Sequence, residues 1–445
     1  MKKVLLCLCF IYIFCLCNLE VYAQSLLGEK DKYVIVIDPG HGGENKGTIA
    51  NPSFEEKDIL MQTALALVKE LEKYEQIEVH LSRTEDVDIS LRDRAVFAKN
   101  IKADFLFSLH YNASENHSMF GTEVWIPLKA PYHSQCYKFA YLQQLEMQDL
   151  GLFSRGIKTR KNDDGKDYYG IIRECVAREI PAVIIEHCYV DEDRDADYVD
   201  EMSDYEEFGR RDAIAIAKFL GVYEDMSGVD ESLYKIKKNE TIAHTYEDFS
   251  GPNQCRIDTE HTDYENGVLT IKVNAVDNQT PVMYYSYSLD GGKTFSKLYA
   301  WPDTDMIACT YSPEFSLMIN VPDGCVPEIV VRAYNKFDIY RTSNKLKGFE
   351  AFLSPTAPPA VISPKKPVIQ EHKSESAIYV IADILNKEPE EVRVSLKRIL
   401  VLVIFLIIWM SILLFMFHTI HYIIKKRGKS QNNKNIKNNM RHRIK

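Results

Sequence analysis

The sequence predicts an α/β domain with a mostly parallel sheet and helices on both faces, followed by an all-β, sandwich-like domain and one C-terminal transmembrane helix. Between residues 32 and 223, apolar runs typical of strands alternate with helical patterns, as in parallel sheets covered on both faces. Residues 246–350 instead contain short alternating segments separated by turn residues. Residues 398–424 are almost continuously apolar. The 445 residues are therefore expected to form more than one domain.

The first domain is predicted from four strand-like and four helix-like segments. The apolar runs that predict strands, each bounded by turn residues, are residues 33–38, 77–82, 103–110 and 182–187. The segments with helical periodicity are residues 54–74, 91–99, 132–150 and 205–220. In the first of these helices, Leu60, Ala64 and Leu67 fall on one face, which is typical of a helix packed on a sheet.

The second domain is predicted to be a β-sandwich of immunoglobulin-like or fibronectin-like type. A polar linker, residues 224–245, precedes it, and its expected strands are residues 268–276, 282–289, 315–321 and 328–335. The Asp-Gly-Gly in residues 288–295 supplies the positive φ angles that a hairpin turn needs. No residues here form a recognisable site, and the sequence leaves the role of this domain open, with binding of an unidentified protein partner as one alternative.

Both ends of the chain carry signals for secretion and membrane attachment. Residues 1–23 match a signal peptide cut after Ala23, with an uncleaved anchor as the alternative. Residues 398–424 are long enough to span a bilayer. The tail 425–445 carries nine Lys or Arg and no acid, which predicts that it lies in the cytoplasm. Residues 351–397 form the proline-rich spacer and juxtamembrane segment of the predicted single-pass membrane protein.

The charge distribution argues against one class of partner, and the cysteine spacing argues against a CxxC-type metal site. The net charge of −10 includes +1 in residues 1–23 and +9 in residues 425–445, which leaves −20 for the region between them. A region this acidic is not expected to bind nucleic acid. The six cysteines after the signal peptide show no CxxC spacing, and the sequence leaves their disulfide status open.

Reactive side chains follow the ends of the predicted strands. In VIVIDPGHGG, residues 34–43, His41 comes just after a strand and lies between glycines, which leave room for a ligand. His110 and Glu186 end two further strands, and Glu56 opens the helix that follows His41. Because ligands bind at the carboxyl edge of open α/β sheets, these four side chains are expected to converge there.

Two imidazoles and one carboxylate with an open fourth position form a known catalytic zinc set. A further carboxylate can then act as the general base toward water. Structural roles stay open for single residues of this group. Glu56 fits a capping box with Ser53, Glu55 competes for its role, and His110 also fits a structural histidine at a strand end. A purely structural role fits Glu186 less well, because a carboxylate after an apolar run needs a partner.

Residues 33–222 resemble the zinc-dependent N-acetylmuramoyl-L-alanine amidases of the type 3 family, which cut peptidoglycan. The matching stretches are IDPGHGG (37–43), EKD (56–58), SRTEDVDISLRDRAVFAK (82–99), ADFLFSLHYNAS (103–114), RGIK (155–158) and PAVIIEHCYV (181–190). The resemblance implies that His41, Glu56 and His110 bind Zn²⁺ and that Glu186 is the catalytic carboxylate. It favours Glu56 over Glu55, because the family's glutamate directly precedes Lys-Asp.

The resemblance implies hydrolysis of the amide bond between N-acetylmuramoyl residues and L-alanine, for wall remodelling or separation, by an enzyme that faces the cell wall. The alternatives are a degenerate amidase domain with a wall-binding or signalling role, and a zinc hydrolase acting on another amide. Two features depart from the family pattern: His187 after the catalytic glutamate, and the unusually charged loop 159–169. Arg83 and Asn112 also lie on motif positions, without an assigned role.

Overall fold

The computed structural model describes residues 32–48, 55–226, 228–265, 267–322 and 325–347. These residues all belong to one compact unit, residues 1–356. The predicted signal peptide, the spacer, the apolar segment 398–424 and the basic tail lie outside the described residues. Among the described helices, none is both long and apolar enough to cross a membrane.

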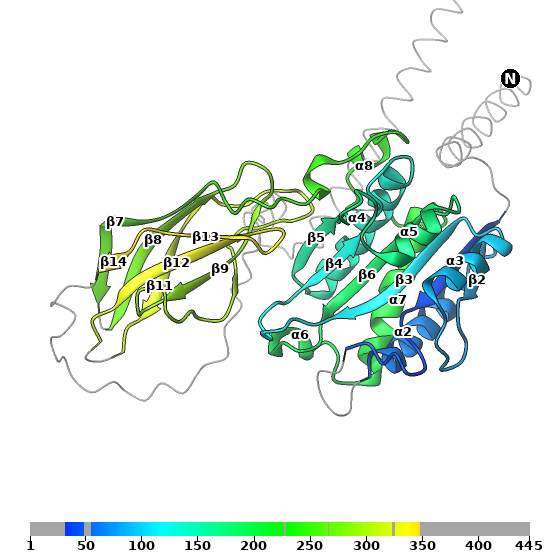
Figure 1. Cartoon of the computed structure of the whole chain (residues 1–445), viewed down its shortest axis with the longest axis horizontal. Coiled ribbons are helices and arrows are strands. Elements are labelled where there is room, and N and C mark those ends of the chain that lie inside the picture. Colours follow the sequence, from blue (N-terminus) through cyan, green and yellow to red (C-terminus); the bar gives the residue numbers. More distant parts are fainter. Residues whose placement is uncertain (1–31, 49–54, 227, 266, 323–324, 348–445) are drawn as a thin grey trace, which may run out of the picture. The chain divides into compact units, whose positions relative to one another are not determined.

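The first domain contains a six-stranded sheet in the order β2-β1-β3-β6-β4-β5 (Figure 1). Its strands are β1 (Tyr33–Pro39), β2 (Ile77–Leu81), β3 (Phe105–Asn112), β4 (Thr122–Trp125), β5 (Ser154–Lys158) and β6 (Ala182–Tyr189). All neighbouring strands are parallel except β4 and β6, which are antiparallel. The prediction of a mostly parallel sheet is confirmed.

Helices cover both faces of this sheet, because alternate residues of the central strands face opposite sides. Ile35, Phe107 and Val183 belong to the core beneath α2 (Glu56–Leu71), α4 (Tyr132–Leu150) and α7 (Met202–Phe219). Val36, Leu106 and Ile184 belong to a second core, beneath α3 (Leu91–Asn100) and α5 (Gly170–Val176). Both faces of β1, β3 and β6 are therefore buried, which explains their uninterrupted apolar sequences.

The sequence predicted four of the six strands but missed β4 and β5. Both strands are fully buried, yet they contain Glu123, Arg155 and Lys158, so their sequences read as polar. Two short helices, α5 and α6 (Asp193–Ala196), were missed as well. Short segments carry too few turns for a periodic pattern to be recognised.

The second domain consists of two antiparallel sheets that share one apolar core. One sheet contains β7 (Gln254–Glu265), β8 (Val268–Val276) and β11 (Glu314–Asn320). The other contains β9 (Val282–Ser288), β10 (Tyr299–Ala300), β12 (Glu328–Asn335), β13 (Tyr340–Thr342) and β14 (Leu346–Lys347). The predicted all-β region is present, and β9 pairs with β10 across the loop that contains the expected hairpin turn.

The two domains share an apolar cluster. Phe120 of the first domain packs with Met283, Tyr284 and Leu298 of the second, and the Tyr284 hydroxyl donates a hydrogen bond to the Phe120 carbonyl. The segment between the domains contains α8 (Ser232–Lys235) and a 3-10 turn, Ala243–Thr245. It lies against the first domain, since Thr159 N donates to the Thr245 carbonyl. The six cysteines in the described part of the chain form no disulfide.

Candidate active site

The loop after β1 holds His41 with its Nε2 atom directed toward Glu56. His41 has a positive φ of 60°, a conformation that few non-glycine residues adopt. Its Nδ1 lies 2.9 Å from Asn45 Oδ1, which can only accept a hydrogen bond, so Nδ1 carries the proton. Nε2, on the other side of the ring, lies 3.2 Å from Glu56 Oε2. Asn45 thus fixes the tautomer that metal binding requires.

His110 extends from β3 into the space that Gly40 leaves open. A Cβ atom on Gly40 would lie 2.2 Å from His110 Cε1, so any other residue here would displace the imidazole. His110 Nδ1 lies 3.2 Å from Glu56 Oε1, and the two histidine rings lie edge to face with centroids 4.9 Å apart. The glycine next to His41 therefore has a steric function, as its sequence position suggested.

Glu56 points toward the two histidines and not back toward the end of its own helix. It is the first residue of α2, where Glu55 is the N-cap residue and makes no side-chain capping hydrogen bond. The Glu56 carboxylate accepts hydrogen bonds from Tyr111 N and Thr48 N. Glu55 lies away from the histidines and pairs with Lys46. The described contacts of Glu56 are those of a site residue, and none is a capping contact.

Burial alone would raise the pKa of Glu56. His110 and His41 outweigh this effect and hold the pKa well below its ordinary value. The carboxylate is therefore ionised at neutral pH. The group His41, Glu56 and His110 could hold a metal ion, since one ligand atom from each lies within 4.8 Å of the others.

Two imidazoles and one carboxylate form a donor set that suits zinc chemically. His41 Nε2 lies 3.2 Å from Glu56 Oε2, and His110 Nδ1 lies 3.2 Å from the other carboxylate oxygen, Oε1. Gly47 also leaves room here, because a Cβ on it would lie 2.4 Å from Glu56 Oε2.

Two buried arginines from the stretch of residues 82–99 hold this arrangement in place. Arg83 donates to the carbonyls of Gly40 and Lys57, which joins the loop of His41 to the helix of Glu56. Arg94 donates to the His41 carbonyl and forms a buried ion pair with Asp38 at 2.7 Å. Arg83, left without a role by the sequence, is therefore a positioning residue.

Glu186 lies next to the metal-binding candidates and has no ionic partner among the residues that the structure describes. Strand register places it beside His110 on β3 and beside Glu123 on β4. Its Oε2 is buried without a hydrogen-bond partner among the described residues. Burial, together with the charges of Glu56 and Glu123, raises the pKa of Glu186 well above its ordinary value. Glu186 therefore keeps its proton to a higher pH than a free glutamate does.

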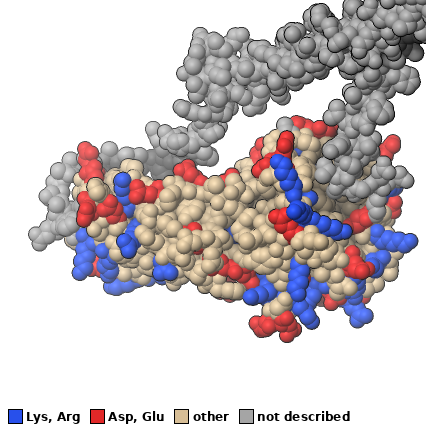
Figure 2. All heavy atoms as spheres, turned by 90° about the horizontal axis from the view of Figure 1, so that it is seen from above, with Lys and Arg blue, Asp and Glu red and all other residues tan. Residues whose placement is uncertain are grey.

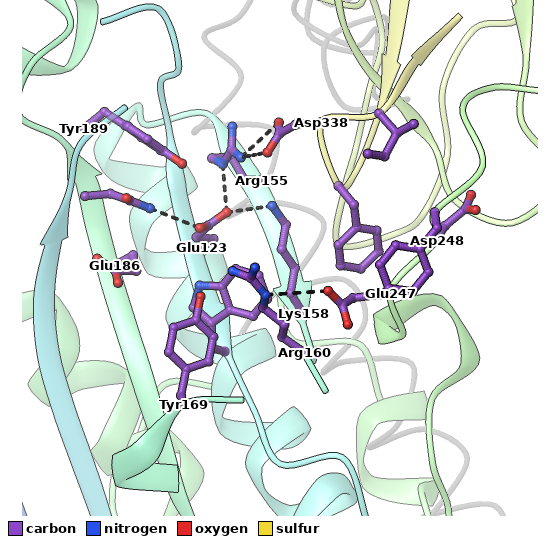
Figure 3. Close-up of a pocket in the computed structure, with 15 residues that line it drawn as sticks. Glu123, Arg155, Lys158, Arg160, Tyr169, Glu186, Tyr189, Glu247, Asp248 and Asp338 are labelled. Carbon is purple, nitrogen blue, oxygen red and sulfur yellow. Dashed lines mark hydrogen bonds and ion pairs between the residues drawn. The ribbon is translucent and has the colours of Figure 1, made fainter. Parts of the chain in front are cut away.

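Sequence reasoning missed a charged cluster on the other side of Glu186. Glu123 accepts hydrogen bonds from Arg155, Lys158 and Asn112, and all three contacts are drawn in Figure 3. The predicted site residues were found because they follow the carboxyl ends of strands. Glu123 instead lies in the first half of β4, and because β4 runs antiparallel to β6, it reaches the same edge of the sheet beside Glu186. The RGIK stretch, which contains Arg155 and Lys158, was the available signal.

Comparison with known proteins assigns the family. The family model described as N-acetylmuramoyl-L-alanine amidase, Amidase_3, matches residues 35–218. The sporulation-specific N-acetylmuramoyl-L-alanine amidase of Bacillus subtilis (strain 168) is 31% identical over 204 residues, which are 46% of this chain and 73% of that protein. The chain belongs to this amidase family.

Other relatives match a similar share of the chain. A probable cell wall amidase of Staphylococcus aureus, LytH, is 32% identical over 178 residues, or 39% of this chain and 54% of that protein. The solved structure of an N-acetylmuramoyl-L-alanine amidase from Clostridium difficile 630 is 30% identical. The match covers 43% of this chain and 98% of the chain in that structure, and the TM-score is 0.38. Homologues in this amidase family are therefore cell wall amidases.

The residue that departs from the family pattern, His187, is structural. It is fully buried on the opposite side of β6 from Glu186, with Nε2 2.7 Å from Asp212 Oδ2. Its Nδ1 lies 2.9 Å from the carbonyl oxygen of His110. His187 therefore links α7 to the strand that carries His110, and it leaves the site residues unobstructed.

Proposed function

We propose that this protein is a zinc-dependent N-acetylmuramoyl-L-alanine amidase that cleaves the bond between the lactyl group of muramic acid and L-alanine in peptidoglycan. The family membership supports the reaction class. The observation that carries the proposal is the group His41, Glu56 and His110 directly beside a carboxyl group, Glu186, that lacks a partner among the described residues.

In this proposal, His41, Glu56 and His110 hold the zinc. When bound, zinc supplies a Lewis acid that polarises the scissile carbonyl and makes water more acidic. Glu186 accepts the proton of the attacking water and returns it to the leaving amine of L-alanine. Its raised pKa suits this role, because the group must hold the proton between the two steps. Arg83, Arg94 and Asn45 keep the ligand residues in position.

We also propose that the protein acts outside the cell, attached to the membrane by the apolar segment of residues 398–424. The basic residues that follow this segment, and the signal-like start of the chain, support that orientation. Carbonate extraction of membranes, combined with protease treatment of whole cells, tests this. Release of the full chain by carbonate would contradict the membrane attachment.

The catalytic proposal is tested by Glu186→Gln, which keeps the shape of the side chain but cannot accept the proton. Release of stem peptides from purified sacculi is expected to fall by about 10²–10⁴-fold, the usual contribution of a general acid–base group. Metal content by elemental analysis should stay at about one zinc per chain. The matched control is Glu115→Gln, at an exposed glutamate of the same domain. Undiminished release by Glu186→Gln would overturn the assignment.

A further inference from the structure

A cleft begins at Glu186 and is walled by both domains. Its volume is about 380 Å³, within the range of small-ligand sites. One wall belongs to the amidase sheet and includes Glu186 and Trp125. The opposite wall includes Phe249, which follows the linker, and Asp338, in the turn between β12 and β13 (Figure 3). The β domain is therefore part of the surface that surrounds the catalytic candidate.

Within the β domain, the buried side chain of Asn335 ties together the two parts of this wall. Asn335 Oδ1 accepts hydrogen bonds from Phe337 N at 2.9 Å and Ile339 N at 3.0 Å, which fixes the turn. Asn335 Nδ2 donates to the Ser250 carbonyl at 2.8 Å. The turn and the segment that carries Phe249 are thus tied to each other.

The same turn is inserted into the amidase domain. Lys336 is fully buried, and its Nζ donates to the His244 carbonyl at 3.2 Å. A Cβ on Gly156 would lie 3.0 Å from Lys336 Cε, so the glycine of the RGIK stretch leaves room for this lysine. Asp338 accepts two hydrogen bonds from Arg155, at 2.8 and 3.1 Å. These contacts make the turn a fixed wall of the cleft.

The lining combines charges of both signs with exposed apolar side chains. Eight of its fifteen residues are charged. The innermost charges pair with one another, whereas Arg160 is 43% exposed and lies 3.7 Å from its partner, Glu247. Phe249 is 67% exposed and Ile339 37% exposed. The cleft therefore suits an elongated ligand that carries carboxylate and amine groups on an aliphatic backbone.

We propose that this cleft binds the stem peptide of the substrate, with the β domain as one side of the peptide-binding site. Arg160 pairs with a peptide carboxylate, and Phe249 and Ile339 pack against the aliphatic parts of the peptide. Stem peptides carry free carboxylates and a diamino acid, whereas the glycan strand offers hydroxyl and acetamido groups without charge. The charged loop 159–169 is then a recognition loop. This inference rests on the proposed amidase function.

The test compares two soluble substrates, N-acetylmuramoyl dipeptide and N-acetylmuramoyl tetrapeptide, with the full chain. Arg160→Gln and Phe249→Ala are expected to raise KM for the tetrapeptide about 10-fold with little change in kcat, since each removes one ground-state contact. KM for the dipeptide should rise by less than about 3-fold, because the shorter peptide makes fewer of these contacts. Arg160→Lys, which keeps the charge, should recover part of the loss.

Arg256→Gln and Met318→Ala serve as matched controls, because both residues are exposed in the β domain and neither lines the cleft. Unchanged KM values in the cleft variants would overturn the inference. An equal rise for both substrates would also overturn it, since the cleft would then bind the part that they share. Increased activity of the variants would show that the wall obstructs the site, again against the proposal.

Binding of free tetrapeptide, measured by calorimetry on the full chain, separates this inference from the proposed function. Binding that Arg160→Gln weakens about 10-fold supports the cleft even if the protein cleaves neither substrate. An active protein that binds no free tetrapeptide, and whose cleft variants behave like the controls, overturns the inference and leaves the amidase proposal standing.

Discussion

The two sides of Glu186 hold equally buried carboxylates with different kinds of partner. Glu56, on the β1–β3 side, is flanked by two histidines, which can be neutral and can exchange a carboxylate contact for a metal. Glu123, on the β4–β5 side, is flanked by Arg155 and Lys158, whose charges pair with the carboxylate itself. The first arrangement is open to a cation, and the second already neutralises its carboxylate.

Glu186 lies between these two carboxylates and shares neither set of partners. Of the three, its pKa alone is raised, while the histidines lower that of Glu56 and the two cations lower that of Glu123. Glu123 and Glu186 lie at paired positions of β4 and β6, and Glu56 opens α2, so carboxyl groups on neighbouring elements have pKa values shifted in opposite directions. Environment, more than residue type, separates the proposed metal ligand Glu56, the proposed acid–base group Glu186 and the ion-paired Glu123. The surface charges do not mark where these carboxyl groups lie. On the face seen in Figure 2, acidic and basic side chains are intermingled.

The largest effect is expected from variants of the histidine–glutamate side. His110→Ala and Glu56→Gln should lower bound zinc from about one per chain to below about 0.1 and reduce peptide release by about 10³-fold or more, because each removes a ligand. Elemental analysis and digestion of sacculi measure the two effects. His80→Ala is the control, since His80 lies outside the histidine–glutamate group and pairs with Glu78 at 2.9 Å. Full zinc content in both ligand variants would refute the assigned site.

A large stability effect is expected on the other side. Glu123→Gln should lower the free energy of unfolding by about 3–5 kcal/mol, because it removes the anion that pairs with buried Lys158 and leaves Arg155 with Asp338 alone. Urea unfolding of the purified chain measures this, with Glu115→Gln as the exposed control. A loss below about 1 kcal/mol would show that the cluster contributes little.

The same residue predicts a pH dependence. Although burial alone would raise it, Lys158 and Arg155 lower the pKa of Glu123 to about 2, from an ordinary value of 4.5. The stabilisation is therefore complete above about pH 4.5 and is lost as the pH falls toward 2. The wild-type chain should lose more stability than Glu123→Gln between these pH values. Urea unfolding at pH 5 and pH 3 measures this. If the free energy of unfolding falls by the same amount in the wild-type chain and in Glu123→Gln, this role of Glu123 is contradicted.

A smaller effect is expected from Asn45→Ala, which removes the acceptor that orients His41. Zinc affinity should fall about 10–100-fold, as for other groups that hold a metal ligand in place, with little change in thermal stability. Competition with a zinc chelator measures the affinity. Asn116→Ala, at an exposed position of another loop, is the control. Unaltered affinity would mean that His41 keeps its orientation without Asn45.

The smallest effect is expected from Glu55→Gln. Glu55 lies beside Glu56 in the sequence but pairs with Lys46 at the surface, so zinc content and peptide release should stay at wild-type values. The contrast with Glu56→Gln tests the assignment of the ligand at the resolution of one residue. If Glu55→Gln lost zinc and Glu56→Gln kept it, Glu55 and not Glu56 would be the metal ligand.

The sequence by itself determined the central sheet and most of the site. Apolar runs predicted β1, β3 and β6, and the carboxyl ends of parallel strands meet at one edge, so His41, His110 and Glu186 could be placed together. Periodicity predicted α2, and therefore the position of Glu56 near His41. These inferences depend on local patterns, which a single sequence contains.

The tertiary structure alone decided which way Glu56 points and what surrounds Glu186. A capping box is a local pattern, whereas the contact of Glu56 with His110 spans 54 positions. β5 was missed because its buried charges find partners far along the chain, such as Asp338, which is 183 positions from Arg155. Burial of a charge depends on a partner that folding brings close, and no local pattern records it.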